Sequence, residues 1–137
     1  MVLEISNLKK HFTAPDGSVQ CVIDVSEFAL REGEQVAVKG ESGTGKTTFL
    51  NLIAGILSAD AGDVRIDGEP MTGRSESERD SIRANKIGYI FQTFNLFQGF
   101  TAIENVLLGM AFGVGVDRAH ASRLLEKVGL ADRSDYL

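Results

Sequence analysis

The sequence predicts a mixed α/β domain that begins with an antiparallel β-meander. Strand-like segments come first, at residues 2–12 and 19–30, and the turn-forming tripeptide Pro15-Asp16-Gly17 separates them. Beyond residue 33, short apolar runs alternate with segments of helical period. The length of 137 residues, with 43% hydrophobic and 24% charged residues, is ordinary for one globular domain.

The first part of this alternation follows a polar break at residues 31–34. Val36–Val38 is expected to be a short buried strand. A helix is expected to begin near Gly45, because the next apolar residues are spaced by three and four, as on one helix face: Phe49, Leu52, Ile53, Ile56 and Leu57. Val64–Ile66, followed by the turn Asp67-Gly68, predicts another strand, and so does Ile87–Phe91.

Two capping boxes predict further helices. Ser75 followed by Glu78 indicates a helix that runs to about Asn85, and Thr101 followed by Glu104 indicates a second one. A last helix is expected over roughly residues 117–128.

Composition excludes several classes of protein. The net charge is −5 and no basic stripe occurs, so nucleic acid is not expected as a partner. A single cysteine rules out an internal disulfide framework. The longest apolar stretch, residues 106–116, is too short to span a bilayer, and the N-terminus lacks the apolar core of a secretory signal.

Residues 40–47 carry the strongest chemical signal, a complete GxxxxGK[ST] phosphate loop. The predicted strand before it and the amphipathic helix after it are the context in which backbone N–H groups and the helix dipole bind phosphates. A glycine-rich turn between strand and helix is the plain alternative. The phosphate-binding residues would be Gly40, Glu41, Ser42, Gly43, Thr44, Gly45, Lys46 and Thr47, with Lys46 reaching the β- and γ-phosphates and Thr47 ligating Mg²⁺.

Other phosphate-loop classes fit less well. A GTPase should carry a DxxG switch and an NKxD guanine reader; the chain has no DxxG, and Asn85-Lys86-Ile87-Gly88 lacks the aspartate. A small-molecule kinase should offer an arginine-rich lid. Arg79 and Arg83 lie four residues apart on a predicted helix, which is more typical of a solvated face.

Three stretches together resemble the ATP-binding subunit of ATP-binding cassette (ABC) transporters. They are GESGTGKTT at Gly40–Thr48, LSADAGDVRIDG at Leu57–Gly68 and IGYIFQTFNLF at Ile87–Phe97. Within that family, the chain is most similar to the lipoprotein-releasing and macrolide-export branch. The resemblance covers residues 1–137 and implies a P-loop NTPase fold of the ABC ATPase type.

The resemblance also implies roles for individual residues. Phe12 falls where the family places the aromatic ring that stacks on adenine, and Gly40–Thr48 would be the Walker A loop, with Thr48 near the α-phosphate. Gln92 matches the Q-loop glutamine, which approaches Mg²⁺ and the attacking water. Without the resemblance, Phe12 is a phenylalanine packed at a strand end and Gln92 is a polar residue that closes a strand.

As the resemblance implies, the ligands would be ATP and Mg²⁺, and the activity would be ATP hydrolysis coupled to export or lipoprotein release. Gln92–Phe100 would receive a transmembrane permease subunit, although its apolar residues Phe94, Leu96, Phe97 and Phe100 could equally be core plugs. A second ATP-binding subunit would complete the assembly. The location implied is cytoplasmic, peripheral on the inner face of the cell membrane.

The family's later motifs do not occur in these 137 residues: an LSGGQ-like signature, a Walker B aspartate with its catalytic glutamate, and a switch histidine. We therefore expect residues 1–137 to be the N-terminal part of a single ABC-type ATP-binding domain with an incomplete core sheet. Val36–Val38 would lack its neighbouring strands, so the chain alone is expected to be marginally stable or prone to aggregation. Because the later motifs are missing, it is also expected to be unable to hydrolyse ATP. Two readings stay open beside this one: a non-hydrolysing nucleotide- or partner-binding module, and a P-loop small-molecule kinase.

Overall fold

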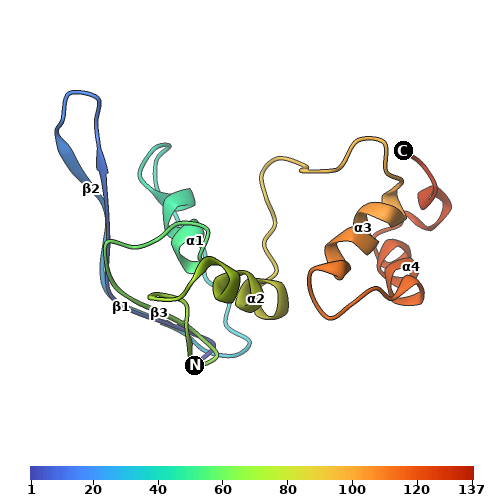
Figure 1. Cartoon of the computed structure of the whole chain (residues 1–137), viewed down its shortest axis with the longest axis horizontal. Helices are drawn as coiled ribbons and strands as arrows, with labels where there is room; N and C mark the ends of the chain where they lie inside the picture. The colour runs from blue at the N-terminus through green and yellow to red at the C-terminus, as the bar shows by residue number, and fades with distance from the viewer. The chain divides into compact units, whose positions relative to one another are not determined.

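The computed structural model describes residues 1–137 and divides them into two compact units, Met1–Ile87 and Gly88–Leu137 (Figure 1). Strands and two helices make up the first unit, whereas the second contains only helices and loops. The predicted α/β composition is confirmed, and each unit is described by itself.

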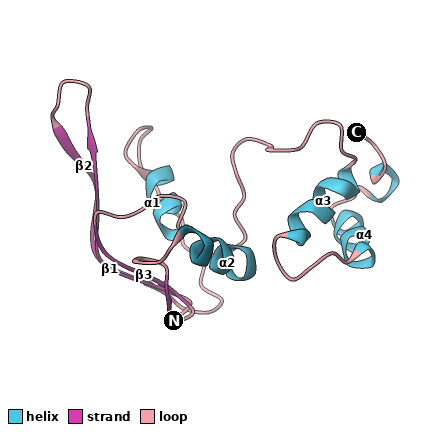
Figure 2. Cartoon of the chain, in the orientation of Figure 1, coloured by secondary structure: helices cyan, strands magenta, loops and turns pink.

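An antiparallel four-stranded sheet forms the first unit's scaffold (Figure 2). Its strands are β1 (Leu3–Thr13), β2 (Val19–Leu30), β3 (Ala61–Ile66) and β4 (Glu69–Pro70), in the spatial order β2-β1-β3-β4. The predicted hairpin around Pro15 is confirmed, and residues 19–30 form one continuous strand. The turn at Asp67-Gly68 joins β3 to β4 as predicted.

Helices α1 (Lys46–Ile53) and α2 (Glu76–Lys86) cover one side of this sheet (Figure 1). Their buried residues Leu52 and Ile82 join apolar residues of the strands in a single core. Burial of such side chains contributes roughly 1.5–3 kcal/mol each, so this core is the main source of the unit's stability. The buried members contributed by the strands and by the segment after β4 are Leu3, Ile5, Leu8, Ile23, Val64, Ile66 and Met71.

An irregularity in β1 explains why its apolar residues alternate imperfectly. Leu3 and Ile5 are buried, but the next buried residue is Leu8, three positions later. Asn7 has a φ of +50° there, and the register with β3 shifts between Ser6 and Lys9. A Cβ on Gly62 would lie 2.2 Å from the Asn7 carbonyl oxygen, so only glycine permits this approach of the two strands.

Two of the predicted strands are wrong. Residues 36–38 and 87–91 form no strand, and Val36, Val38 and Ile90 are 56%, 44% and 96% exposed. Their apolar, β-favouring composition is real, but a strand also needs a neighbour to accept its ladder hydrogen bonds. The sheet order β2-β1-β3-β4 contains no neighbour for either segment.

Arg79 and Arg83 on α2 do not form a solvated face. Arg79 Nη1 donates to the hydroxyl of Ser58 at 3.0 Å, and Arg83 Nη1 donates to the carbonyl oxygen of Ala54 at 3.0 Å. Ala54 is the C-cap of α1, so Arg83 satisfies a helix-terminal carbonyl. Both arginines therefore hold the end of α1 against α2.

The second unit is a helical hairpin of α3 (Ala102–Ala111) and α4 (Arg118–Lys127), followed by the short 3₁₀ helix η1 (Ala131–Arg133). Ile103, Ala121 and Leu125 are its buried core. Ala102 N and Ile103 N donate to the carbonyl oxygens of Tyr136 and Ser134, so residues that follow η1 supply acceptors at the start of α3.

Both predicted capping boxes are confirmed. Ser75 caps α2 and Thr101 caps α3, with reciprocal bonds to Glu78 and Glu104. The Ser75 hydroxyl and backbone N–H donate to the Glu78 carboxylate at 2.7 and 2.9 Å, which lowers the pKa of Glu78 below its usual 4.5. The Asp117 carboxylate caps α4 by accepting from His120 N at 2.9 Å.

The Ser75 cap makes a testable contribution to stability. We expect Ser75→Ala to lower the free energy of unfolding by about 1 kcal/mol near neutral pH. Because the pKa of Glu78 is lowered in the folded state, part of this contribution is present above about pH 5 and is lost as the pH falls through the lowered pKa. The difference between Ser75→Ala and the parent should therefore shrink in acid.

Urea unfolding followed by circular dichroism at several pH values measures this difference. Ser81→Ala is the matched control, since Ser81 lies in the same helix and its exposed hydroxyl caps nothing. Equal losses in the two variants would contradict the capping account.

Candidate phosphate-binding site

The predicted phosphate loop leads directly into α1, which begins at Lys46. Gly45 is the N-cap residue, with a left-handed φ of +96°, and its carbonyl accepts the helical bond from Phe49 N at 2.8 Å. A Cβ on Gly45 would lie 2.9 Å from Val22 Cγ1 and 3.2 Å from the Val22 carbonyl oxygen. Glycine therefore lets the start of α1 approach β2 closely.

Helix α1 begins without a side-chain cap. The other three α-helices are capped by Ser75, Thr101 and Asp117, whereas Gly45 has no side chain to offer. The first turn of α1 also holds no acidic residue. Free N–H groups and an uncompensated positive helix end make this terminus suited to an anion.

Lys46 folds back over the loop that precedes it. Its ammonium donates to the carbonyl oxygens of Gly40 and Glu41, both at 2.5 Å. The Thr44 hydroxyl donates to the same Glu41 oxygen at 2.7 Å, and a Cβ on Gly40 would lie 2.7 Å from that hydroxyl. The backbone of the loop thus curls around the Lys46 ammonium group.

Ser42, Gly43, Thr47 and Thr48 complete the predicted loop. Ser42 and Gly43 form the exposed turn of the loop, and Gly43 has a φ of +80°. Thr47 and Thr48 occupy the first turn of α1, with Thr47 exposed and Thr48 half-buried. The exposed Thr47 hydroxyl is an oxygen ligand of the kind that binds Mg²⁺, so this residue is compatible with the predicted metal.

Phe12 lies near the end of β1, paired with Gln20 of β2. Val22, the residue against Gly45, is only two positions from Gln20, or about 7 Å along the strand. Leu8, Lys10 and Phe12 alternate along β1, so Phe12 continues the face on which Leu8 packs in the core. Its ring is 42% exposed, so the alternative of a packed strand-end residue does not describe it fully.

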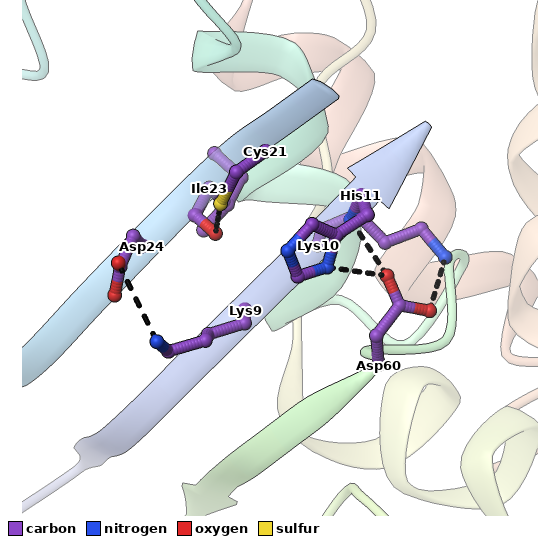
Figure 3. A network of polar contacts seen from close by, with 7 residues as sticks. All are labelled: Lys9, Lys10, His11, Cys21, Ile23, Asp24 and Asp60. Carbon is purple, nitrogen blue, oxygen red and sulfur yellow. Dashed lines mark hydrogen bonds and ion pairs between the residues drawn. The ribbon is translucent and has the colours of Figure 1, made fainter. Parts of the chain in front are cut away.

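Sequence reasoning missed Asp60, which ties the end of β1 to the turn before β3 (Figure 3). The carboxylate of Asp60 accepts from His11 N at 2.6 Å and pairs with the Lys10 ammonium at 3.3 Å. The bond from His11 N is the main cause of the lowered pKa of Asp60. A lone aspartate in a turn gives no signal of such long-range contacts, which only the pairing of the strands creates.

Gln92 belongs to the second unit, in an exposed segment without regular secondary structure. Lys46 and Gln92 therefore lie in different units, and their meeting in one site stays a prediction. The strand that Gln92 was expected to close is absent.

The apolar loop after Gln92 lines a groove of about 1140 Å³ within the second unit. Phe94, Leu96 and Phe97 are largely exposed, so they do not plug a core. Asn105 of α3 holds the loop: its side-chain oxygen accepts from Phe97 N at 2.8 Å. Its amide nitrogen donates to the carbonyl oxygens of residues 97, 100 and 101 at 3.1–3.3 Å. Sequence analysis did not single out Asn105.

Comparison with known proteins identifies the family. The ABC transporter family model matches residues 23–137, and the chain belongs to that family. The branch that the sequence resembles is also supported by the curated relatives, and nothing in the comparisons favours a small-molecule kinase.

The relatives include LolD 2, a lipoprotein-releasing system ATP-binding protein of Rhodospirillum rubrum, which is 40% identical over 139 residues. That alignment covers 98% of this chain and 60% of the relative. LolD of Francisella tularensis is 35% identical over 140 residues, covering 99% and 60%. The chain thus spans about three fifths of the length of these relatives.

Solved structures agree with the fold prediction. The dimeric post-hydrolysis structure of the ATP-binding cassette MJ0796, bound to ADP and Pi, is similar with a TM-score of 0.86 and 31% identity. The similarity covers 97% of this chain and 60% of that chain. The chain therefore has the partial P-loop NTPase fold that the motifs predicted.

The close contact at Gly45 leads to a prediction that separates crowding from backbone conformation. Gly43 and Gly45 both have positive φ, but a Cβ on Gly43 would meet open space. Gly43→Ala should lower the free energy of unfolding by about 1 kcal/mol, the cost of the left-handed conformation. Gly45→Ala should lower it by about 3 kcal/mol, because the methyl group also collides with Val22. Chemical unfolding of both variants measures the difference, and equal losses would refute the role of the contact.

Proposed function

We propose that residues 40–48 bind the phosphates of Mg-ATP. The observation that carries the proposal is the start of α1, which no side chain caps and where the Lys46 ammonium bonds the preceding loop. A triphosphate would replace the Gly40 and Glu41 carbonyl oxygens as the partners of Lys46. Exchanging neutral acceptors for anionic ones strengthens its hydrogen bonds.

In this proposal, the exposed Phe12 ring stacks on the adenine and the Thr47 hydroxyl ligates Mg²⁺. Gln92 would approach Mg²⁺ and the attacking water, as the resemblance of its motif to the Q-loop implies. When bound, the metal neutralises charge on the phosphates. The ADP and Pi bound to the cassette MJ0796 are consistent with this choice of ligand.

Substitution of Lys46 tests the phosphate site. Lys46→Ala should weaken Mg-ATP binding by about tenfold or more, because a charged hydrogen-bond donor to phosphate is lost. Isothermal titration calorimetry measures the affinity, and circular dichroism confirms that the variant is folded. Lys39→Ala is the matched control, since it removes the same charge just outside the loop. Equal affinity of the parent and Lys46→Ala would overturn the proposal.

For the whole protein, we propose an ATPase subunit that couples ATP hydrolysis to export or lipoprotein release. Residues 1–137 would be the N-terminal part of its single ATP-binding domain, and a second ATP-binding subunit would complete the assembly. The names of the LolD relatives support the lipoprotein-releasing branch. None of the helices combines the length and apolar character needed to cross a bilayer. We propose attachment to the inner face of the membrane through a permease.

The second unit offers the surface for that permease. Its groove is lined mainly by apolar side chains, and the Asn105 side chain hydrogen-bonds to the backbone of the Phe94–Phe100 part of its rim. An apolar segment of a transmembrane subunit would cover side chains that are otherwise exposed to water. Gln92 lies just before this rim, so permease contact and nucleotide site would be neighbours in sequence.

The groove can be tested with proteoliposomes that hold the transmembrane subunit of the same transporter. Phe97→Ser should weaken co-flotation of the chain by about tenfold, because a large apolar contact is lost. Val114→Ser is the control: Val114 is at least as exposed but lies outside the groove. Equal losses in both variants, or none, would reject the groove as the permease site.

A further inference from the structure

The end of β1 carries a charged pair that phosphate binding does not use. Lys10 and Asp60 lie 50 residues apart in the chain, and their side chains meet at 3.3 Å. The Lys10 side chain is only 16% exposed, which is unusual for a lysine. Figure 3 shows the Asp60 carboxylate facing both Lys10 and His11 from the turn before β3.

Asp60 is bound to β1 through the backbone as well. Its own N–H donates to the Lys9 carbonyl oxygen at 2.9 Å, and its carboxylate accepts the N–H of His11 at 2.6 Å. Ala61 is the first residue of β3 and pairs with Lys9, and the ladder between β1 and β3 ends at this pair. Asp60 therefore extends the ladder beyond β3 and satisfies a β1 donor that no strand reaches.

Lys10 in turn contacts the predicted base-stacking residue. Its ammonium lies over the Phe12 ring, 5.5 Å from the centroid. A cation at this distance is attracted to the ring face, and a partly buried one more strongly than an exposed one. Phe12 is 42% exposed, so part of its ring is accessible to a ligand. Contacts therefore run from Asp60 to Lys10 and from Lys10 to the Phe12 ring, and we call this pair of contacts the relay.

We propose that Asp60 is a positioning residue for the nucleotide base: it holds Lys10 against one face of Phe12, so that the base stacks on the opposite face. This inference rests on the proposed nucleotide site and adds two residues to its base-binding end. Asp60 and Lys10 would raise affinity for the base without touching the phosphates.

Two ligands distinguish binding at the base end of the proposed nucleotide site from binding at its phosphate loop. ATP would use both ends, whereas inorganic tripolyphosphate would use the phosphate loop alone. Calorimetric titration of the 137-residue chain with each, in Mg²⁺, gives the ratio of their affinities. We expect Asp60→Asn to weaken ATP binding about three- to fivefold and to leave tripolyphosphate binding unchanged. The asparagine keeps an oxygen for His11 N but loses the charge that holds Lys10.

Asp24→Asn is the matched control. Asp24 pairs with Lys9 at 3.6 Å on the same hairpin, so the substitution removes an equal charge from an ion pair that includes neither Lys10 nor Asp60 (Figure 3). It should leave both affinities unchanged. Lys10→Met provides a second route, and combined with Asp60→Asn it should cost no more than either change alone.

Each outcome decides the proposal. Equal weakening of ATP and tripolyphosphate by Asp60→Asn would reduce Asp60 to a structural role, and no weakening of either would overturn the proposal directly. If Asp60→Asn fails to fold, Lys10→Met decides: an unchanged ratio rejects the relay. If the parent chain binds neither ligand, the proposed phosphate site itself is wrong. If the parent binds both ligands and the variants bind them equally well, only the role of Asp60 is wrong.

Discussion

The close approach of Gly45 to Val22 of β2 is the contact on which the candidate site depends. It places the first turn of α1 directly against Val22, at a point where the pairing of β1 and β2 is irregular. Since Gly45 is also the N-cap, the same absence of a side chain leaves the helix start uncapped. One residue thus joins the loop to the sheet and keeps its N–H groups available for an anion.

The sheet connects the two ends of the proposed nucleotide site. Val22 supports the phosphate loop from β2, while Phe12 and Lys10 lie on the neighbouring β1, and Asp60 reaches the same stretch from the turn before β3. Three segments distant in sequence therefore meet over a short length of one strand pair. Backbone pairing of β1 and β2 holds Val22 near Phe12, and Gly45 packs against Val22, which favours a preorganised site.

The second unit presents several large apolar side chains on its surface. Asn105 uses both ends of its amide to hold the backbone of residues 97–101. With its polar groups satisfied, the loop can keep its aromatic side chains exposed instead of collapsing onto α3. An apolar groove supported by a polar anchor is suited to binding an apolar partner, which is the basis for the proposed permease contact.

Local signals in the sequence were sufficient for the starts of the helices, the hairpin and the phosphate loop, because each depends on residues within a few positions of one another. Ser75 and Glu78, or Gly45 and Lys46, are such cases. The end of α1 was predicted too late, since the helix stops at Ile53 and Ile56 and Leu57 lie beyond it. The two strands expected at 36–38 and 87–91 failed because a strand is defined by its neighbours. Asp60 escaped notice for the same reason: its partners Lys10 and His11 lie about 50 positions away in the chain. Short-range chemistry is readable in sequence, whereas pairing between distant segments requires the fold.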